Sequence, residues 1–228
     1  MIDRKTPDMP SFWAAFVPPP PATGWRERVR GALGAAIGIV LIGFVSAWWM
    51  GAVPNGLPFL IAPLGASAVL LFAVPASPLA QPWPIVGGNV IAALIGVTVA
   101  RWVADPVVAS SLALGISIAA MSGLRCVHPP GGAVAMTAVL GGSHITAAGY
   151  GFALEPVLLN SVLLTVVAIL FNTATGHSYP HRAHATAQPM PDALTPADFD
   201  AVLADYGETL DIDAADLRAL YEDLRRRA

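Results

Sequence analysis

Charged residues are almost absent from a long central stretch of this 228-residue chain. Between residues 31 and 175 the only Asp, Glu, Lys or Arg side chains are those of Arg101, Asp105, Arg125 and Glu155. Over the whole chain 12% of the residues are charged, whereas a soluble globular protein carries about 25%. This pattern predicts an all-α membrane protein, because a helix satisfies its own backbone hydrogen bonds inside lipid.

The apolar stretch divides into segments of different length. A helix of about 20 apolar residues crosses a bilayer, and four segments come close to that length: 31–51, 85–102, 107–124 and 156–171. Residues 57–74 are also apolar but are interrupted at Pro63, and residues 131–140 form a short apolar segment. The proline-rich residues 75–84 predict a tight, structured loop, and residues 143–155 predict a loop.

The two ends of the chain differ from its centre. Residues 1–27 are predicted to be an interfacial, proline-rich segment, followed by a membrane domain over residues 28–176. Three arginines within residues 26–30 indicate a cytoplasmic start. Residues 177–194 are read as a linker, and residues 195–228 as an acidic tail of two short helices. We therefore expect a multi-pass protein of a bacterial-type plasma membrane, with both termini in the cytoplasm.

The run from Arg125 to Ala133 breaks the apolar pattern with an Arg, a His, two prolines and two glycines. Pro129 and Pro130 cannot donate main-chain hydrogen bonds, so an arriving helix should stop near Arg125 and a new helix can start at Pro130. The first amides of that helix, on Gly131, Gly132 and Ala133, are expected to be free. Free amides at the positive end of a helix dipole predict a binding site for an anion.

An internal repeat relates this run to an earlier one. Pro63 begins a Pro-x-Gly-Ala-x-Ala pattern that recurs, 67 positions later, at Pro130. The repeats would cover about residues 31–104 and 107–175. Two arrangements stay open: three plus three crossings with inverted halves, which we favour, or four spans with two re-entrant segments. Broken helices at corresponding positions of two halves indicate a transporter site near the middle of the membrane.

The candidate substrate-binding residues flank these two breaks. They are Gly65, Ala66, Ser67, Asn89, Arg125, His128, Gly131, Gly132, Ala133, Thr137 and Asn160. Each has a simpler structural interpretation. The glycines can allow close helix packing, the hydroxyls of Ser67 and Thr137 can bond to their own helices, the asparagines can cap helices, and Arg125 and His128 can lie at helix ends.

Several kinds of site are not expected. The single cysteine, Cys126, excludes an internal disulfide and a cysteine-rich metal site. We predict no metal and no cofactor. No basic stretch indicates nucleic-acid binding. No paired carboxylate or nucleophile accompanies His128, so we do not expect an enzyme.

Five stretches resemble the HPP family of integral membrane proteins, in the same order along the chain: residues 62–68, 77–82, 87–89, 128–133 and 179–182. Plant chloroplast members of this family are associated with nitrite transport. The resemblance implies a membrane domain over about residues 25–182. Trp83-Pro84 and Asn89 stand where relatives often have a basic residue and a histidine.

These observations favour a transporter or channel for a small inorganic anion, with nitrite first and nitrate second. The alternatives are a membrane enzyme that uses His128 as acid or base, and a membrane scaffold or sensor that acts through its acidic tail. The expected partners are the anion, the lipid bilayer and further copies of the chain in a homo-oligomer, with a dimer favoured.

Overall fold

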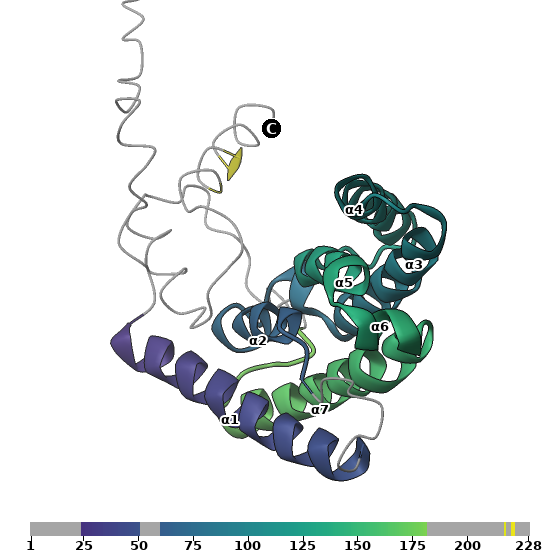
Figure 1. Ribbon diagram of the computed structural model, residues 1–228. Coiled ribbons are helices and arrows are strands. Elements are labelled where there is room, and N and C mark those ends of the chain that lie inside the picture. Colours follow the sequence, from purple (N-terminus) through teal and green to yellow (C-terminus); the bar gives the residue numbers. More distant parts are fainter. Residues whose placement is uncertain (1–23, 51–59, 182–216, 218–219, 222–228) are drawn as a thin grey trace, which may run out of the picture.

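The computed structural model describes residues 24–50, 60–181, 217 and 220–221. All regular elements of this part are helical (Figure 1). They are α1 (Trp25–Met50), α2 (Pro63–Ala73), η2 (Pro78–Ala80), η3 (Pro84–Gly88), α3 (Asn89–Trp102), α4 (Pro106–Gly123), α5 (Pro129–Leu140), α6 (Ser143–Ala148), η4 (Ala153–Leu158) and α7 (Leu159–Ala174).

Four helical stretches are long and apolar enough to cross a membrane: Trp25–Trp49, Pro84–Trp102, Pro106–Gly123 and Ala153–Ala174. The helices α2 and α5 are shorter, with 11 and 12 residues. At 1.5 Å per residue each extends about 17 Å, roughly half of a 30 Å hydrocarbon core. The predicted all-α membrane protein is thus confirmed as a helical bundle with four candidate spans.

Proline and aspartate set several of the helix starts. Pro63, Pro106 and Pro129 each lie in the first turn of their helix, where the missing N–H costs nothing. Asp105 caps α4, since its carboxylate accepts hydrogen bonds from the amides of Val107 and Val108 at 2.9 Å. The predicted turn at residues 105–106 therefore separates α3 from α4.

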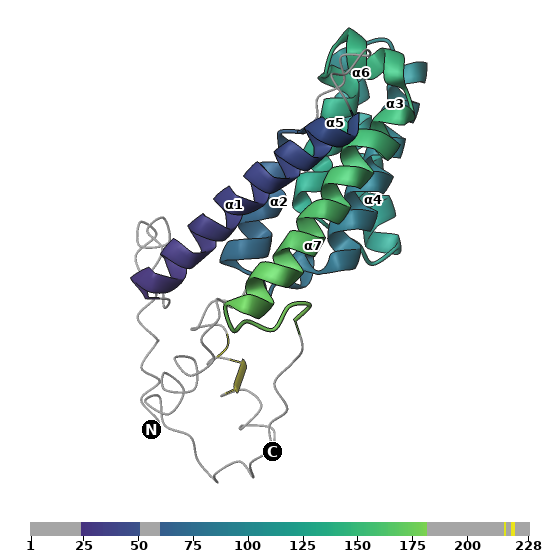
Figure 2. The same cartoon turned by 90° about the horizontal axis from the view of Figure 1, so that it is seen from below.

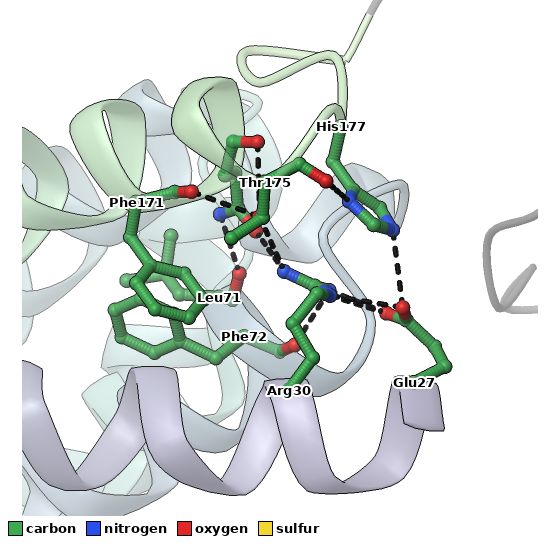
Figure 3. Close-up of polar contacts among 8 residues, drawn as sticks. Glu27, Arg30, Leu71, Phe72, Phe171, Thr175 and His177 are labelled. Carbon is green, nitrogen blue, oxygen red and sulfur yellow. Dashed lines mark hydrogen bonds and ion pairs between the residues drawn. The ribbon is translucent and has the colours of Figure 1, made fainter. Parts of the chain in front are cut away.

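One end of the bundle is held together by Arg30 of α1 (Figure 3). Its guanidinium pairs with Glu27 and donates to the carbonyl of Phe72, at the end of α2, at 3.2 Å. It also donates to the side chain of Asn172, near the end of α7, at 2.9 Å. The start of α1 therefore meets the ends of α2 and α7 at this end of the bundle (Figure 2). Helices α2 and α7 thus run toward this end, and α1 runs away from it.

The helix α5 runs in the opposite direction to α2. A Cβ on Gly88, before α3, would lie 2.7 Å from the carbonyl oxygen of Cys126, before α5. A Cβ on Gly96, two turns further along α3, would lie 2.5 Å from the carbonyl oxygen of Ala135. Helices α3 and α5 therefore run side by side in the same direction. The end of α3 carries Arg101, whose guanidinium lies 4.6 Å from the ring centroid of Tyr150 at the far end of the bundle.

The loop between α2 and η3 is structured, as predicted. The side-chain amide of Gln81 donates to the carbonyls of Pro75 and Ser77 at 3.0 and 2.8 Å. The buried Tyr179, which follows α7, donates from its hydroxyl to the carbonyl of Ala80 at 2.7 Å. Burial raises the pKa of the Tyr179 hydroxyl above its usual value.

Two predictions about the chain after α5 need correction. Residues 143–155 were expected to form a loop, but they include α6 and the start of η4. The last span begins at Ala153, three residues before the predicted start at Pro156, because the wide π turn of η4 accommodates a proline inside the helix. The predicted tail at 195–228 lies outside the described residues apart from 217 and 220–221, as does the segment 1–23.

Loss of the Arg30 contacts is expected to lower stability. An Arg30→Gln variant removes the ion pair with Glu27 and the charged hydrogen bonds to Phe72 and Asn172, a loss of about 2 kcal/mol. For a chain of this size the melting temperature in detergent should fall by about 4–8 °C. The matched control is Arg28→Gln, which removes the same charge from an exposed position of α1. Equal melting temperatures for the two variants would contradict this role.

Candidate functional site

The helix break between α4 and α5 occurs where the sequence predicts it. The helix α4 ends at Gly123, and Arg125 adopts the left-handed conformation with φ of 55°. The amide of Cys126 then donates to the carbonyl of Met121 at 2.8 Å, which turns the chain back toward the bundle. His128 is the N-cap of α5, and Pro129 is its first residue.

The His128 side chain is completely buried and links two other parts of the protein. Its Nδ1 lies 2.9 Å from the carbonyl oxygen of Leu79, in the loop before η3. Its Nε2 lies 2.8 Å from the hydroxyl oxygen of Ser67, in the second turn of α2. A carbonyl oxygen can only accept, so Nδ1 carries the proton in the neutral ring, and Nε2 then accepts from the Ser67 hydroxyl. The start of α5 is thereby joined to the first half of α2.

The glycines near this contact serve close helix packing. A Cβ on Gly131 would lie 3.1 Å from the carbonyl oxygen of Gly88, and a Cβ on Gly132 would lie 2.8 Å from a methyl carbon of Leu114. Gly65, by contrast, has open space beside it and is exposed. The structural interpretation of Gly131 and Gly132 as small packing residues therefore holds.

Two of the backbone donors in the expected anion cradle are already used. The amide of Gly65 donates to the carbonyl of Ala62 at 3.1 Å, and the amide of Gly131 donates to the carbonyl of His128 at 2.8 Å. The expectation of a free amide at Gly131 is therefore wrong, and the Gly65 amide near the start of α2 is bonded in the same way. The physical reason is that both helices open with a tight turn, in which carbonyls three positions earlier accept these bonds.

The two candidate asparagines lie at similar positions in the chain. Asn89 is the first residue after the π-helical segment η3, and Asn160 is the second residue after the π-helical segment η4. Asn89 follows η3, and its amide nitrogen lies 3.1 Å from the hydroxyl of Ser161 in α7. Asn160 follows η4, and its amide donates to the carbonyl of Pro156, while its oxygen lies 3.3 Å from the Ser46 hydroxyl of α1. Both side chains are buried. π-helical turns inside α-helices frequently occur at functional sites.

The side-chain oxygen of Asn89 has no hydrogen-bond partner among the described residues, although the residue is only 1% exposed. Because the oxygen and nitrogen of an amide exchange by rotation, the Ser161 contact can be made by either atom, and the other is then free. A polar atom that is buried and unpaired costs free energy. A free amide nitrogen could recover it by donating to an anion, and a free amide oxygen could recover it by accepting from a water molecule. The hydroxyl of Ser117 in α4 is also buried without a partner in this part of the chain.

The structure does not bring all of the predicted residues together. Ser67 and His128 are in contact, and Gly131 and Gly132 lie beside them at the start of α5. The exposed side chain of Arg125 follows the end of α4 on the surface. Thr137 bonds back to the carbonyl of Ala133 at 2.7 Å. The remaining predicted residues that are exposed are Gly65, Ala66 and Ala133.

Sequence analysis missed three groups that hold the site. They are the carbonyl of Leu79 and the hydroxyls of Ser46 and Ser161. Serines are common in packed membrane helices, so only the contacts themselves distinguish these two. The described residues contain no group of three or more His, Cys, Asp and Glu side chains placed to hold a metal ion. Hydrogen bonding is the chemistry that this arrangement offers.

The comparison with protein families decides the family of the chain. The family described as "HPP, transmembrane region" matches residues 20–180, which is well over half of the sequence. The chain belongs to the HPP transmembrane family. The match covers both short helices, both π-helical segments and the Ser67–His128 contact.

Two relatives of the chain are described as transmembrane proteins of Dictyostelium discoideum. One is 36% identical over 126 residues, which cover 53% of this chain and 44% of the relative. The other is 35% identical over 127 residues, which cover 54% of this chain and 40% of the relative. The chain thus spans less than half the length of these curated relatives. No solved structure matches the chain.

Proposed function

We propose that this HPP protein is a transporter or channel for a small inorganic anion, with nitrite as the first candidate and nitrate as the second. The observation that carries the proposal is the buried contact between Ser67 and His128, 2.8 Å long, which joins the two short helices near their starts. Short helices that meet inside a membrane domain are typical of transporter binding sites.

The order and direction of the helices support two inverted halves. The first half is α1, α2 and α3, and the second is α4, α5 and α7, so each contains a long, a short and a long helix. The short helices α2 and α5 run toward opposite ends of the bundle. Each half also has a π-helical segment before its last long helix, η3 before α3 and η4 before α7. We therefore favour three plus three crossings over two re-entrant segments.

The donors for an anion are side-chain groups together with the positive ends of two helix dipoles. The Ser67 hydroxyl, the His128 ring and the amide of Asn89 are all buried. They can donate hydrogen bonds to oxygen atoms of nitrite after a change of partner. The starts of α2 and α5 add about half a positive charge each. The two helix starts together supply about one positive charge, which balances the charge of a monovalent anion. A site that binds without a fixed buried cation can release the anion again.

We further propose a bacterial-type plasma membrane with both termini in the cytoplasm, and a homo-oligomer, with a dimer favoured. The orientation rests on Arg26, Arg28 and Arg30 at the start of α1, because basic residues are enriched in cytoplasmic segments. The Arg30–Asn172 contact supports a common side for the start of α1 and the end of α7.

Cys126 provides a reporter for this proposal. It is the only cysteine, it is completely buried, and it lies two residues before His128. Since transport requires the closed site to open, nitrite should change the rate at which N-ethylmaleimide labels Cys126 in membranes several-fold, and sulfate at the same concentration should not. A Cys126→Ser, Ser122→Cys protein provides the control, because Ser122 is exposed. Nitrite-independent labelling of Cys126 would count against an anion site at this contact.

A further inference from the structure

A groove of about 400 Å³ lies between α1 and α7, away from the site described above. Its walls are mainly apolar and include Val29, Leu33 and Ile37 of α1 and Phe171 of α7. Trp25 and Arg26 line it at the start of α1. At this end of the bundle Arg30 of α1 bridges to Asn172 of α7 and to Thr175 directly after it. The groove thus combines a long apolar wall with a basic and aromatic end.

The apolar wall has the length of one membrane leaflet. Val29, Leu33 and Ile37 are spaced four residues apart on one face of α1, and they are 47%, 54% and 46% exposed. From Arg26 to Ile37 the helix rises about 16 Å, close to half of a 30 Å hydrocarbon core. One acyl chain that starts at the level of Arg26 would therefore contact the whole wall.

The charge at the basic end comes from Arg26. The second arginine that lines the groove, Arg30, is paired with Glu27 and donates its other hydrogen bonds to Asn172, Thr175 and Phe72. Arg26 makes no ion pair with a described residue, and its guanidinium lies 5.8 Å from the ring centroid of Trp25. Tryptophan and arginine at the start of a membrane helix are typical of the headgroup region. Within the part of the chain that the structure describes, the groove therefore presents one positive charge without an ion-pair partner, and its place at the start of α1 corresponds to the headgroup level.

We propose that this groove binds an anionic phospholipid. The phosphate is held by Arg26 beside Trp25, and one acyl chain lies along Val29, Leu33 and Ile37 against Phe171. The apolar wall favours a lipid over free phosphate, because free phosphate would contact only the Arg26 end. A basic pocket between membrane helices is a common form of anionic lipid site.

The test is native mass spectrometry of the full chain in detergent with phosphatidylglycerol or phosphatidylcholine of equal acyl length. The wild type should retain phosphatidylglycerol in preference to phosphatidylcholine. Arg26→Gln should lower phosphatidylglycerol retention about fivefold, the effect of one basic residue near an anionic headgroup. Arg28→Gln is the matched control, since Arg28 lies on the same turn but does not line the groove, and its retention should stay within about twofold of wild type.

A second pair of variants tests the acyl-chain wall. Leu33→Ala should lower retention about twofold, whereas Leu41→Ala, at a similarly exposed position of α1 beyond the groove, should not. Soluble glycerol phosphate at the same concentration as the lipid should not displace phosphatidylglycerol. The proposal is overturned by equal retention of the two lipids in the wild type. It is also overturned by equal losses in Arg26→Gln and Arg28→Gln, or by displacement with glycerol phosphate.

Discussion

A Gly96→Val variant is expected to yield little folded protein. A Cβ at this position would lie 2.5 Å from the carbonyl oxygen of Ala135, 3.0 Å from its Cα and 2.7 Å from the Cβ of Ala138. Two of these atoms belong to the backbone of α5 and cannot rotate away, so α3 and α5 would have to separate. Overpacking of this kind costs about 3 kcal/mol or more. The measurement is the monodisperse fraction after detergent extraction, together with the melting temperature of that fraction.

The control for this variant is Gly115→Val. Gly115 lies within α4, is exposed, and has no atom within 4 Å of an added Cβ. Its replacement should change stability by no more than about 0.5 kcal/mol, because valine is a slightly better helix former than glycine. If Gly96→Val and Gly115→Val melt at the same temperature, α3 and α5 do not pack as described.

Replacement of His128 should impair anion uptake more than any other single change near the break. His128→Ala removes the hydrogen bonds to Ser67 and Leu79, and it leaves the buried Ser67 hydroxyl and the partly buried Leu79 carbonyl without these partners. If the hydrogen bonds of His128 contribute about 1.5–3 kcal/mol to anion binding, uptake should fall about tenfold to hundredfold. His128→Asn should retain the Leu79 contact alone, since its amide reaches the place of Nδ1. It should therefore fold better than His128→Ala while still transporting poorly.

The pH profile of uptake separates a functional from a structural role of His128. If the ring exchanges a proton during transport, His128→Asn should flatten the pH dependence of uptake, because an asparagine amide does not titrate. Protonation would also require the Ser67 hydroxyl to reverse its hydrogen bond, because Nε2 then becomes a donor. An unchanged pH profile in His128→Asn, with normal uptake, would reduce His128 to a helix cap.

The breaks at Pro63 and Pro129 could be predicted from sequence because proline acts locally. It removes a backbone donor and restricts the residue before it, whatever the surroundings. The lengths of the apolar runs located the four long apolar helices to within about six residues, the largest difference being the start of α1 at Trp25 instead of residue 31. They did not find α6, because six residues between two glycines are too few to show a helical period. They did not find η3 and η4, because a π turn is a tertiary accommodation within an apolar helix.

The candidate site was predictable in part for a related reason. An ionisable residue in an apolar segment is costly, so His128 could be singled out, and the repeat brought attention to Ser67. The contact between them depends on the packing of α2 against α5, which no local pattern encodes. Gly131 was expected to offer a free amide, and its bond to the His128 carbonyl follows from a tight first turn that becomes visible only in three dimensions.

Uptake of nitrite by proteoliposomes tests the central claim most directly. Purified wild-type protein, His128→Ala protein and protein-free liposomes of the same lipid composition are compared, with reconstituted amounts and orientation measured in each sample. The account predicts saturable nitrite uptake in the wild type, at least about tenfold above that of His128→Ala. Wild-type vesicles that take up nitrite and nitrate no faster than protein-free liposomes would contradict it.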